Sequence, residues 1–321
     1  MYIRLKSEKD WLLKNEGIFL STPNHQIEKV INTDNNLEFF NFIKFLEDFR
    51  TNDEIESYTY LTSEEKSDVL SYLDSNKYIQ KSNDKLCLTR NDYFFNIFPG
   101  VESGSILSRI KEKRLIIVGL GTIGSYLVDL FSRIGFENII IIDGDKVEEK
   151  NISAQLYYSS DIGNYKVDVL KQRFEEKVTA INKYISNFED LKATVGGFSE
   201  DDIVINAADD YKLTLSLAES IVNKIFVGSL IVCGYGPLLV TAYLINNENK
   251  AKFLIEYVTQ LLNERKKEER ISRNSGICLN GFIGSFFVAK MIIDLFLEID
   301  SEVASYNFVN NEFYLTSEME E

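Results

Sequence analysis

The chain has 321 residues, of which 45% are hydrophobic and 26% are charged, so it can bury a core and is not a disordered polymer. Its formal net charge is −15 and its pI is about 4.7. This acidity excludes phosphate backbones and anionic membranes as main partners, because like charges repel. We therefore expect no nucleic acid and no membrane among its partners. The single histidine, His25, excludes most histidine-based catalysis.

Three cysteines, Cys87, Cys233 and Cys278, are far apart and form no C-x-x-C pair. They exclude a four-cysteine zinc site, and their sparse, odd number fits a reducing cytoplasm. The segment Met1–Trp11 carries charges throughout, which argues against a signal peptide. The apolar runs have the length of strands rather than membrane spans. We expect a soluble cytoplasmic protein.

The N-terminal part predicts a small α+β module of the winged-helix type over residues 1–90, and residues 91–321 predict a second domain. Pro99-Gly100 and Ser103–Ser105 interrupt the pattern between them. The expected elements of the first module are strands at Ile18–Leu20 and Ile27–Ile31, a helix at Leu37–Phe49, a helix capped by Ser63 that runs through Leu73, and a hairpin of Tyr78-Ile79 with Leu86–Leu88.

The second part alternates strands and helices, which predicts an α/β domain with a Rossmann-like, mostly parallel sheet and crossover helices. Strands are expected at Leu115–Val118, Ile139–Ile142, Ile203–Ile205 and within Phe226–Cys233. Helices are expected from Gly124 through Leu130 and over residues 164–182, 250–272 and 281–297. We expect the tail after Asn310 to be frayed.

A glycine-rich loop, Gly119-x-Gly121-x-x-Gly124, separates a predicted strand from a predicted helix. Glycines permit a tight turn, and the helix N-terminus presents free amides to negative charge. Asp143 ends the next strand, where a carboxylate accepts hydrogen bonds from a ribose hydroxyl pair. These features predict a nucleotide site, and by themselves they would also suit a nicotinamide dehydrogenase.

An ordered set of motifs follows the loop. It runs Asp143-Gly-Asp145-Lys-Val147, then Asn151 and Gln155, then Asp161-Ile-Gly163-x-x-Lys166, then a strand that leads to Asp209, and finally Asn280-Gly281-x-x-Gly284. The set resembles the ThiF family, which includes ubiquitin-activating enzymes and the sulfur-carrier activators of thiamine and molybdopterin synthesis. The resemblance covers about residues 85–298. It implies ATP and Mg²⁺ as cofactors and adenylation of a carboxyl group as the activity.

The resemblance also implies roles for single residues. Gly119, Gly121, Gly124, Asp143, Asp145 and Gln155 would bind the nucleotide, Asn151 and Lys166 would contact its phosphates, Asp209 would hold magnesium, and Arg90 would reach into a partner subunit's site as an N-terminal arginine of the family does. A carboxylate that attacks the α-phosphate needs the phosphate charge neutralised, and these residues would do so. As simpler alternatives, Lys166 could be merely solvated, and Asp209 or Asp210 could be a helix cap.

One family residue is missing, because the arginine before the glutamine is Ala154 here. Arginines that stabilise phosphoryl-transfer charge contribute on the order of 10³–10⁵ in rate. Arg90, Arg109 and Lys150 are cations that could compensate. Many relatives also carry a cysteine that accepts the activated carboxyl, but we expect Cys233 and Cys278 to be inert core cysteines.

A winged-helix module before a ThiF domain resembles the arrangement in peptide-modifying enzymes of ribosomal natural-product (RiPP and bacteriocin) pathways, such as the microcin C adenylating enzyme. There the module resembles a RiPP recognition element, which captures a leader peptide as an added strand. The resemblance predicts an adenylyltransferase that activates a carboxyl group of a precursor peptide, and a homodimer, for which the apolar last helix also argues. Three alternatives stay open: a silent ThiF-like scaffold that delivers leader peptide to a partner cyclodehydratase, a nicotinamide dehydrogenase, and a module that serves dimerisation or DNA.

Overall fold

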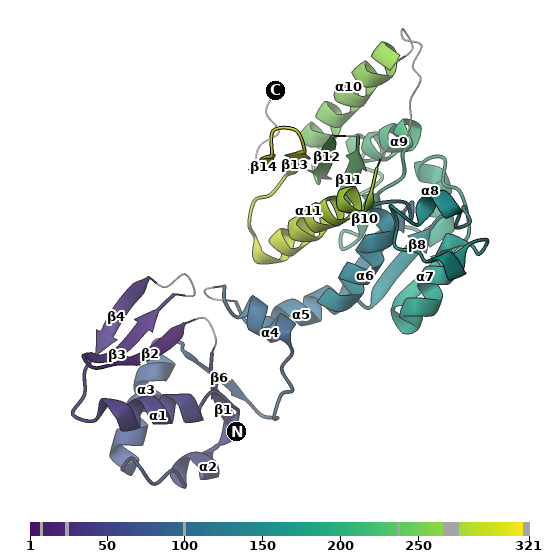
Figure 1. Cartoon of the computed structure of the whole chain (residues 1–321). Helices are drawn as coiled ribbons and strands as arrows, with labels where there is room; N and C mark the ends of the chain where they lie inside the picture. The colour runs from purple at the N-terminus through teal and green to yellow at the C-terminus, as the bar shows by residue number, and fades with distance from the viewer. Residues whose placement is uncertain (7–8, 23–25, 99–100, 237, 266–275, 317–321) are drawn as a thin grey trace. The chain divides into compact units, whose positions relative to one another are not determined.

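The computed structural model describes residues 1–6, 9–22, 26–98, 101–236, 238–265 and 276–316. The chain forms two compact units, Met1–Leu107 and Ser108–Glu321. Figure 1 shows the first unit in purple and blue and the second from blue through green to yellow.

The N-terminal unit contains two small sheets with strand orders β5-β1-β6 and β2-β3-β4 among the described residues. All pairings within them are antiparallel. The strands are β1 (Tyr2–Leu5), β2 (Asp10–Lys14), β3 (Gly17–Ser21), β4 (Ile27–Ile31), β5 (Arg50–Thr51) and β6 (Ile79–Ser82). The fully buried β3 lies between the two exposed edge strands β2 and β4.

The helices of this unit are α1 (Asn36–Phe45), α2 (Asn52–Glu56), α3 (Ser63–Ser75), α4 (Arg90–Phe95) and the first part of α5 (Ser103–Glu112). The predicted cap of α3 was wrong by one residue. Thr62 is the N-cap, and Thr62 and Glu65 form a reciprocal capping box. Phe42, Leu46 and Leu73 are fully buried between the helices and the sheets.

The predicted hairpin near residues 78–88 was also wrong. The strand β6 pairs with β1, with Ile79 opposite Leu5, and Leu86–Leu88 does not form a strand. The pairing is nonlocal, so the apolar pattern of residues 78–88 does not reveal it. The strand β2, which carries Trp11, was missed.

The buried side chain of Arg4 fastens α4 to this unit. Its guanidinium lies 5.6 Å from the ring centroid of Phe49 and 5.1 Å from that of Tyr93 in α4. Asp92 accepts a hydrogen bond from the hydroxyl of Ser103. The compact units therefore divide inside α5, after Leu107, whereas the functional boundary at residue 90 stays a prediction.

The second unit is built on a sheet with strand order β14-β13-β12-β11-β10-β7-β8-β9. Its strands are β7 (Arg114–Val118), β8 (Asn138–Ile142), β9 (Val178–Ile181), β10 (Ile203–Asn206), β11 (Ser229–Tyr235), β12 (Leu239–Ile245), β13 (Val303–Asn307) and β14 (Glu312–Thr316). Strands β11, β10, β7, β8 and β9 are parallel, and β12, β13 and β14 extend the sheet antiparallel. The predicted α/β class with a mostly parallel sheet is confirmed.

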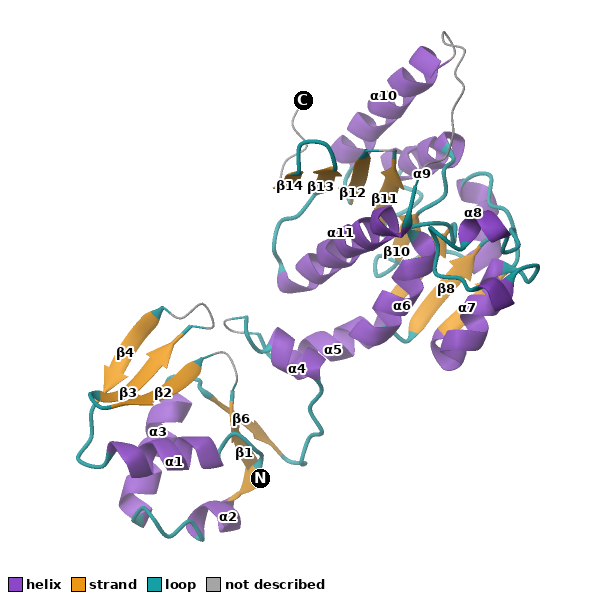
Figure 2. Ribbon diagram, viewed as in Figure 1, coloured by secondary structure: helices purple, strands orange, loops and turns teal. Residues whose placement is uncertain are grey.

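Helices cover both faces of this sheet (Figure 2). They are α6 (Gly124–Ile134), α7 (Lys166–Phe174), α8 (Phe188–Val195), α9 (Tyr211–Val222), α10 (Glu248–Arg265) and α11 (Cys278–Leu297), with short 3₁₀ helices at Glu149–Asn151, Ser159–Asp161 and Glu175–Lys177. The central strands are apolar on both sides, as expected of a sheet buried between two helical layers. Ile116, Val118 and Val204 pack in one core cluster with residues of α8, α9 and α10, while α6 and α11 contact each other and α11 contacts β11 and β12.

Several predicted bounds needed correction. The helix expected over 164–182 ends at Phe174, because Val178–Ile181 adds to the sheet edge as β9. The tail expected to be frayed pairs with β13 through Glu312–Thr316. The charged helix expected over 250–272 is α10 as far as Arg265, and the rest of that prediction lies outside the described residues.

The helix α11 is long and apolar enough to span a membrane by length and composition. However, 61% of the most apolar 18-residue stretch of this helix is buried inside the unit, as in the core helix of a folded domain. Its buried face includes Phe287, Met291 and Phe296. It begins at Cys278, three residues earlier than predicted.

Candidate nucleotide-binding site

The glycine loop makes a tight turn at the carboxyl end of β7. Gly119 has φ +90°, and a Cβ there would lie 2.7 Å from the amide nitrogen of Ala208. A Cβ on Gly124 would lie 1.9 Å from the carbonyl oxygen of Gly119. At Gly121, by contrast, a Cβ would meet only the side chain of Gln155, at 4.0 Å. Gly119 and Gly124 are therefore needed to form the turn, whereas at Gly121 only the side chain of Gln155 lies near the position of a Cβ.

The carboxylate of Asp143 is fixed against this loop from the end of β8. Its Oδ2 accepts a 2.7 Å hydrogen bond from the amide of Leu120, and its Oδ1 accepts one of 2.7 Å from the amide of Asp145. Only 8% of the Asp143 side chain is exposed. The predicted ribose ligand is thus held rigidly beside the turn that would carry the phosphates.

Lys166 begins α7 and points back toward the same strand end. Its Nζ lies 3.1 Å from Oδ2 of Asp145 and 4.0 Å from Oδ2 of Asp143. The lysine side chain is 6% exposed, so it is not simply solvated. The hydroxyl of Tyr184 donates to Oδ1 of Asp145 over 2.6 Å. This bond is the largest cause, ahead of Lys166, of an Asp145 pKa below its ordinary value.

The segment after β8 brings Asn151 and Gln155 to the loop. The Oδ1 of the buried Asn151 accepts a bond from the amide of Glu148 over 2.8 Å, and among the described residues none accepts a hydrogen bond from its Nδ2. Gln155 lies over Gly121, and its Oε1 is buried without a hydrogen-bond partner in the described part of the chain. Both amides therefore have polar groups left for a ligand. Ala154, in the same turn, is buried.

Two contacts outside the motifs attach this segment to the glycine loop and to the helix α6 that follows it. The buried Tyr157 donates its hydroxyl hydrogen to the carbonyl oxygen of Leu120 over 3.0 Å. The amide of Leu156 donates to the hydroxyl of Ser125 over 3.0 Å. A tyrosine in a loop belongs to no motif, so the sequence carries no signal of this role, and only the fold reveals that Tyr157 is buried.

The two acidic residues after β10 have different environments. Asp210 is the N-cap of α9, and its Oδ1 accepts bonds from the amides of Lys212 and Leu213 at 2.8 Å and 3.2 Å. Asp209 is exposed and makes no side-chain hydrogen bond or ion pair with any residue that the structure describes. The capping alternative thus applies to Asp210, and the carboxylate of Asp209 stays available.

The order of the strands explains how these residues meet. Strand β7 carries the glycine loop and lies between β8, which leads to Asp143, and β10, which leads to Asp209. Neighbouring strands are about 4.8 Å apart, so the two carboxylates leave strands separated by about 10 Å. In open α/β sheets ligands bind at this carboxyl edge.

The ThiF family model matches residues 93–310, which is more than half of the chain. The chain belongs to the ThiF family. Among curated relatives, the tRNA threonylcarbamoyladenosine dehydratase of Haemophilus influenzae is 31% identical over 117 residues, covering 35% of this chain and 44% of the relative. Ubiquitin-like modifier-activating enzyme 5 of Caenorhabditis elegans is 23% identical over 184 residues, covering 53% and 43%. The chain thus spans less than half the length of these relatives.

Solved structures match nearly the whole chain. Escherichia coli MccB, crystallised with AMPCPP and MccA, has a TM-score of 0.68 and 17% identity, covering 98% of this chain and 96% of that one. The structure of PaaA has a TM-score of 0.70 and 16% identity, covering 97% and 98%. At these identities the likeness shows the fold alone, which this chain shares with MccB and PaaA.

The residues of the candidate nucleotide-binding site fit a magnesium–nucleotide complex better than a metal that is held by protein side chains alone. No group of three or more His, Cys, Asp or Glu side chains that could hold a metal occurs in the described residues. Magnesium commonly uses one or two carboxylates together with substrate phosphates and waters. The exposed Asp209 beside the glycine loop matches that donor set.

The three cations considered in place of the missing arginine lie in different surroundings. Arg109 is 5.5 Å from the ring centroid of Phe296, at the opposite end of α11 from Cys278, so it does not belong to the ThiF site. Lys150 is exposed beside Asn151 and pairs with Glu148 at 2.8 Å. Arg90 is exposed at the start of α4 in the N-terminal unit, and its role stays a prediction.

The two cysteines of the ThiF domain differ from each other. Cys233 is buried, and burial raises the pKa of its thiol to about 12, which fits the predicted inert role. Cys278 is only partly buried at the first residue of α11, and its amide donates to the carbonyl oxygen of Ser153. The prediction of a core position was therefore wrong for Cys278, which lies next to the segment that carries Asn151 and Gln155.

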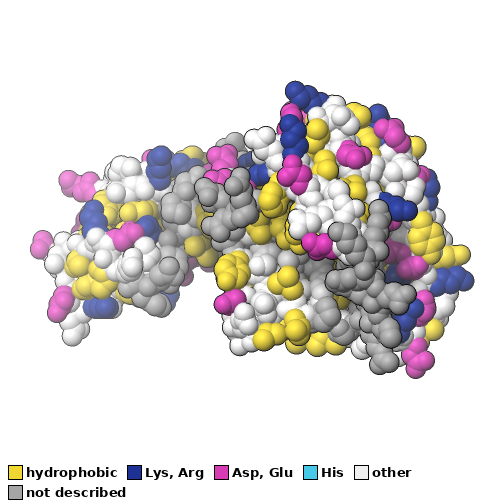
Figure 3. Space-filling view, turned by 90° about the horizontal axis from the view of Figure 1, so that it is seen from above, with side chains coloured by type: hydrophobic (Ala, Val, Ile, Leu, Met, Phe, Trp, Pro, Cys, Tyr) yellow, Lys and Arg dark blue, Asp and Glu magenta, His cyan; other side chains and the backbone are white. Residues whose placement is uncertain are grey.

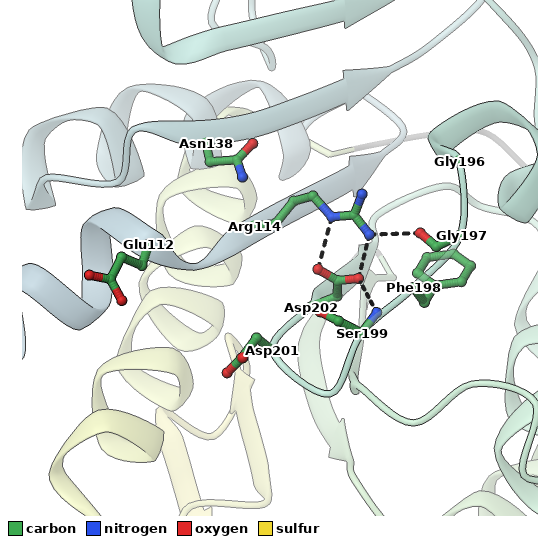
Figure 4. Close-up of a pocket in the computed structure, with 9 residues that line it drawn as sticks. All are labelled: Glu112, Arg114, Asn138, Gly196, Gly197, Phe198, Ser199, Asp201 and Asp202. Atoms are coloured by element: carbon green, nitrogen blue, oxygen red, sulfur yellow. Dashed lines mark hydrogen bonds and ion pairs between the residues drawn. The ribbon is translucent and has the colours of Figure 1, made fainter.

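A pocket of about 480 Å³ lies at the opposite, amino edge of the ThiF sheet (Figure 4). Arg114 donates through Nε to Asp202 over 2.8 Å and through Nη2 to the carbonyl oxygen of Gly197 over 2.7 Å. The amide of Ser199 also donates to Asp202. The hydrogen-bonding groups of Arg114 and Asp202 are thus paired within the protein, and their bonds hold this edge of the sheet together. The pocket is not part of the nucleotide site.

Charges of both signs are mixed on the face of the molecule that Figure 3 shows. Lys and Arg side chains do not gather there into one basic stripe of the kind that follows a nucleic-acid backbone.

Proposed function

We propose that this protein is a cytoplasmic, ATP- and Mg²⁺-dependent adenylyltransferase that activates a carboxyl group of a ribosomally made precursor peptide. The observation that carries the proposal is the placement of Asp143 and Asp209 on either side of the glycine loop, with Lys166 directed at the same strand end. The MccB structures support the peptide class, because one of them is of the microcin C7 biosynthetic enzyme MccB in complex with N-formylated MccA.

Each residue has a physical task in this reaction. Asp143 accepts hydrogen bonds from the ribose hydroxyls, and the lack of a side chain at Gly121 lets the backbone approach the phosphates. Lys166 and the Nδ2 of Asn151 offset negative charge on the phosphates, and Asp209 holds the metal. ATP supplies the AMP group, whose α-phosphorus is attacked by the peptide carboxylate as pyrophosphate leaves. Such a reaction depends mainly on positioning and charge stabilisation.

The N-terminal unit offers an edge for the peptide. Strand β4 pairs only with β3 among the described strands, and Ile27–Val30 is exposed along it. An extended peptide can add to such an edge through main-chain hydrogen bonds. The ammonium of Lys29 lies 4.7 Å from the ring centroid of Tyr72 in α3, so this helix lies close to β4 and offers side-chain contacts.

We also propose that the protein acts as a homodimer. The mostly buried α11 exposes Leu279, Phe282 and Phe286, each about half exposed. Apolar side chains at such spacing form a stripe along a helix, and a second copy of the chain would bury it. Arg90 would reach the partner subunit's site in this dimer and would offset the loss of charge at Ala154.

Thermal unfolding with and without Mg·ATP tests the nucleotide site. A ligand at about 100 times its Kd stabilises the folded state by roughly 2.7 kcal/mol, which raises Tm by a few degrees. Lys166→Ala and Asp209→Ala should each abolish the rise. Lys171→Ala is the matched control, since Lys171 is an exposed lysine further along α7.

Product analysis separates the enzyme from the scaffold. A peptide shown to bind the N-terminal unit is incubated with the protein and Mg·ATP, and pyrophosphate release and peptide mass are measured. Release of pyrophosphate that Lys166→Ala prevents supports the adenylyltransferase. A bound peptide of unchanged mass, with no pyrophosphate and no effect of ATP on Tm, would instead identify a scaffold that delivers leader peptide to a cyclodehydratase.

A further inference from the structure

The side chain of Tyr184 is exposed but held at both ends. It follows β9 at the carboxyl edge of the sheet, and 70% of the residue is exposed. Its ring lies directly on Gly144, because a Cβ at that glycine would fall 2.5 Å from the ring. Its hydroxyl donates to Oδ1 of Asp145 over 2.6 Å. An aromatic ring in solvent that is fixed in this way presents a preorganised face to a ligand.

The order of strands shows which part of a nucleotide would meet this ring. The glycine loop follows β7, Asp143 follows β8 and Tyr184 follows β9, and these three strands are neighbours. In a nucleotide the phosphates and the base leave the ribose from opposite ends. A ribose held at Asp143, with its phosphates directed to the glycine loop, therefore directs its base toward β9.

We propose that the ring of Tyr184 is the platform on which the base of the nucleotide stacks. The inference rests on the proposed nucleotide-binding function and adds a residue that no motif contains. Each kind of base has a π-face, and stacking on an aromatic side chain contributes to affinity without reading the base edge. The platform should therefore bind purine nucleotides more tightly than pyrimidine nucleotides, because a purine offers a larger stacking area. The difference in affinity between adenine and guanine nucleotides should be smaller.

The hydroxyl of Tyr184 makes a contact that is separate from the face of the ring. Asp145 is shared between this hydroxyl and the ammonium of Lys166, 3.1 Å away. The bond fixes the edge of the ring, and it also directs one oxygen of Asp145 away from the lysine. The Tyr184→Phe variant keeps the ring and removes this bond, and the Tyr184→Ala variant removes both.

Calorimetric titration of the full chain with Mg·ATP tests the platform. We expect Tyr184→Ala to weaken binding about tenfold and Tyr184→Phe to bind within about twofold of the unaltered protein. The Tyr60→Ala variant is the control, because Tyr60 is also 70% exposed but belongs to the N-terminal unit. It should bind ATP normally. Titration with Mg·CTP should show a smaller loss for Tyr184→Ala than titration with Mg·ATP.

The outcomes separate this inference from the proposed function. Failure of the unaltered protein to bind Mg·ATP would remove both. Normal binding by the unaltered protein together with equal binding by Tyr184→Ala would overturn the platform alone. Equal losses of ATP affinity in Tyr184→Phe and Tyr184→Ala would also overturn the platform, since the hydrogen bond to Asp145, and not the ring, would then account for the affinity. Ligand-free unfolding curves of the variants show whether each is folded.

Discussion

The hydroxyl of Tyr157 donates to the main-chain oxygen of Leu120 over 3.0 Å, and so joins two segments that are 37 residues apart in the chain. One segment is the glycine loop and the other carries Asn151 and Gln155. Two halves of the candidate site are thus held in one geometry before any ligand arrives. Such preorganisation lowers the cost of ordering the site upon binding.

Tyr157→Phe should therefore destabilise the protein and weaken ATP binding. The substitution leaves the carbonyl of Leu120 without its buried partner, which costs about 1–3 kcal/mol in the free energy of unfolding. Urea unfolding measures this cost. The control is Tyr306→Phe, which removes an exposed hydrogen bond to Asn311 and should change stability by less than about 0.5 kcal/mol. Equal effects of the two substitutions would contradict the role of Tyr157.

The same tyrosine predicts a pH dependence. Burial is the largest cause that raises the pKa of Tyr157 well above its ordinary value. In the unfolded chain the phenol loses its proton near pH 10. The contribution of the protonated Tyr157 phenol to the stability of the fold is thus complete below about pH 10. It is lost as the pH rises from there toward the pKa of Tyr157 in the folded state. The free energy of unfolding should fall more steeply above pH 10 in the unaltered protein than in Tyr157→Phe. Parallel profiles would mean that the phenol is not buried.

Three glycine-to-alanine substitutions separate folding from binding. Gly124→Ala places a methyl group against the backbone of Gly119 and should destabilise the protein by about 1–3 kcal/mol. Gly121→Ala meets no backbone, so it should fold normally and lose affinity for ATP. At Gly104, in α5, an added methyl group would meet nothing within 4 Å. Gly104→Ala should therefore lower neither the stability of the protein nor its affinity for ATP. Thermal unfolding and ATP titration of each variant measure both effects. Normal ATP affinity in Gly121→Ala would show that no ligand approaches the loop.

Adjacent aspartates should give opposite results. Asp210→Ala removes the N-cap of α9 and should cost about 0.5–2 kcal/mol in stability. Asp209→Ala removes an exposed carboxylate, so stability should stay within about 0.5 kcal/mol while Mg²⁺-dependent ATP binding is lost. Urea unfolding and titration with ATP, with and without Mg²⁺, distinguish the two. Loss of magnesium dependence in Asp210→Ala alone would contradict the assignment of the metal to Asp209.

Thiol labelling should follow burial. In the folded protein a disulfide reagent such as Ellman's reagent should modify the exposed Cys87 first, then the partly buried Cys278, and leave Cys233 unmodified until unfolding. With a pKa of about 12, almost none of the Cys233 thiol is ionised at pH 8. Mass spectrometry of the labelled peptides gives the order. Rapid labelling of Cys233 would restore it as a candidate acceptor of the activated carboxyl.

Much of the ThiF domain could be predicted because its evidence is local. Runs such as Leu115–Val118 are buried on both faces and therefore have a continuous apolar pattern. The ordered motifs identified the residues that the structure gathers at one sheet edge. The sequence alone could not exclude Arg109 from the candidate site, since its distance from that site depends on the direction of α11 in the fold.

Nonlocal pairing explains most of the remaining errors. Strand β6 pairs with β1 across about 75 residues, and Val178–Ile181 becomes a strand because β8 offers it an edge. Neither partner is visible within a short window of sequence. The aromatic residues Tyr157 and Tyr184 were missed for a related reason, because their importance comes from what they contact and not from their spacing.

The hydrogen bond from Leu120 to Asp143 has a consequence for selectivity. This amide of the glycine loop has an anionic partner that is built into the chain. A free phosphate or sulfate ion that approached the same amide would be repelled by the carboxylate. A nucleotide brings ribose hydroxyls that donate to the carboxylate, so the same group attracts it. We therefore expect the loop to disfavour free phosphate and sulfate relative to a nucleotide, because only the nucleotide brings a donor for the carboxylate of Asp143.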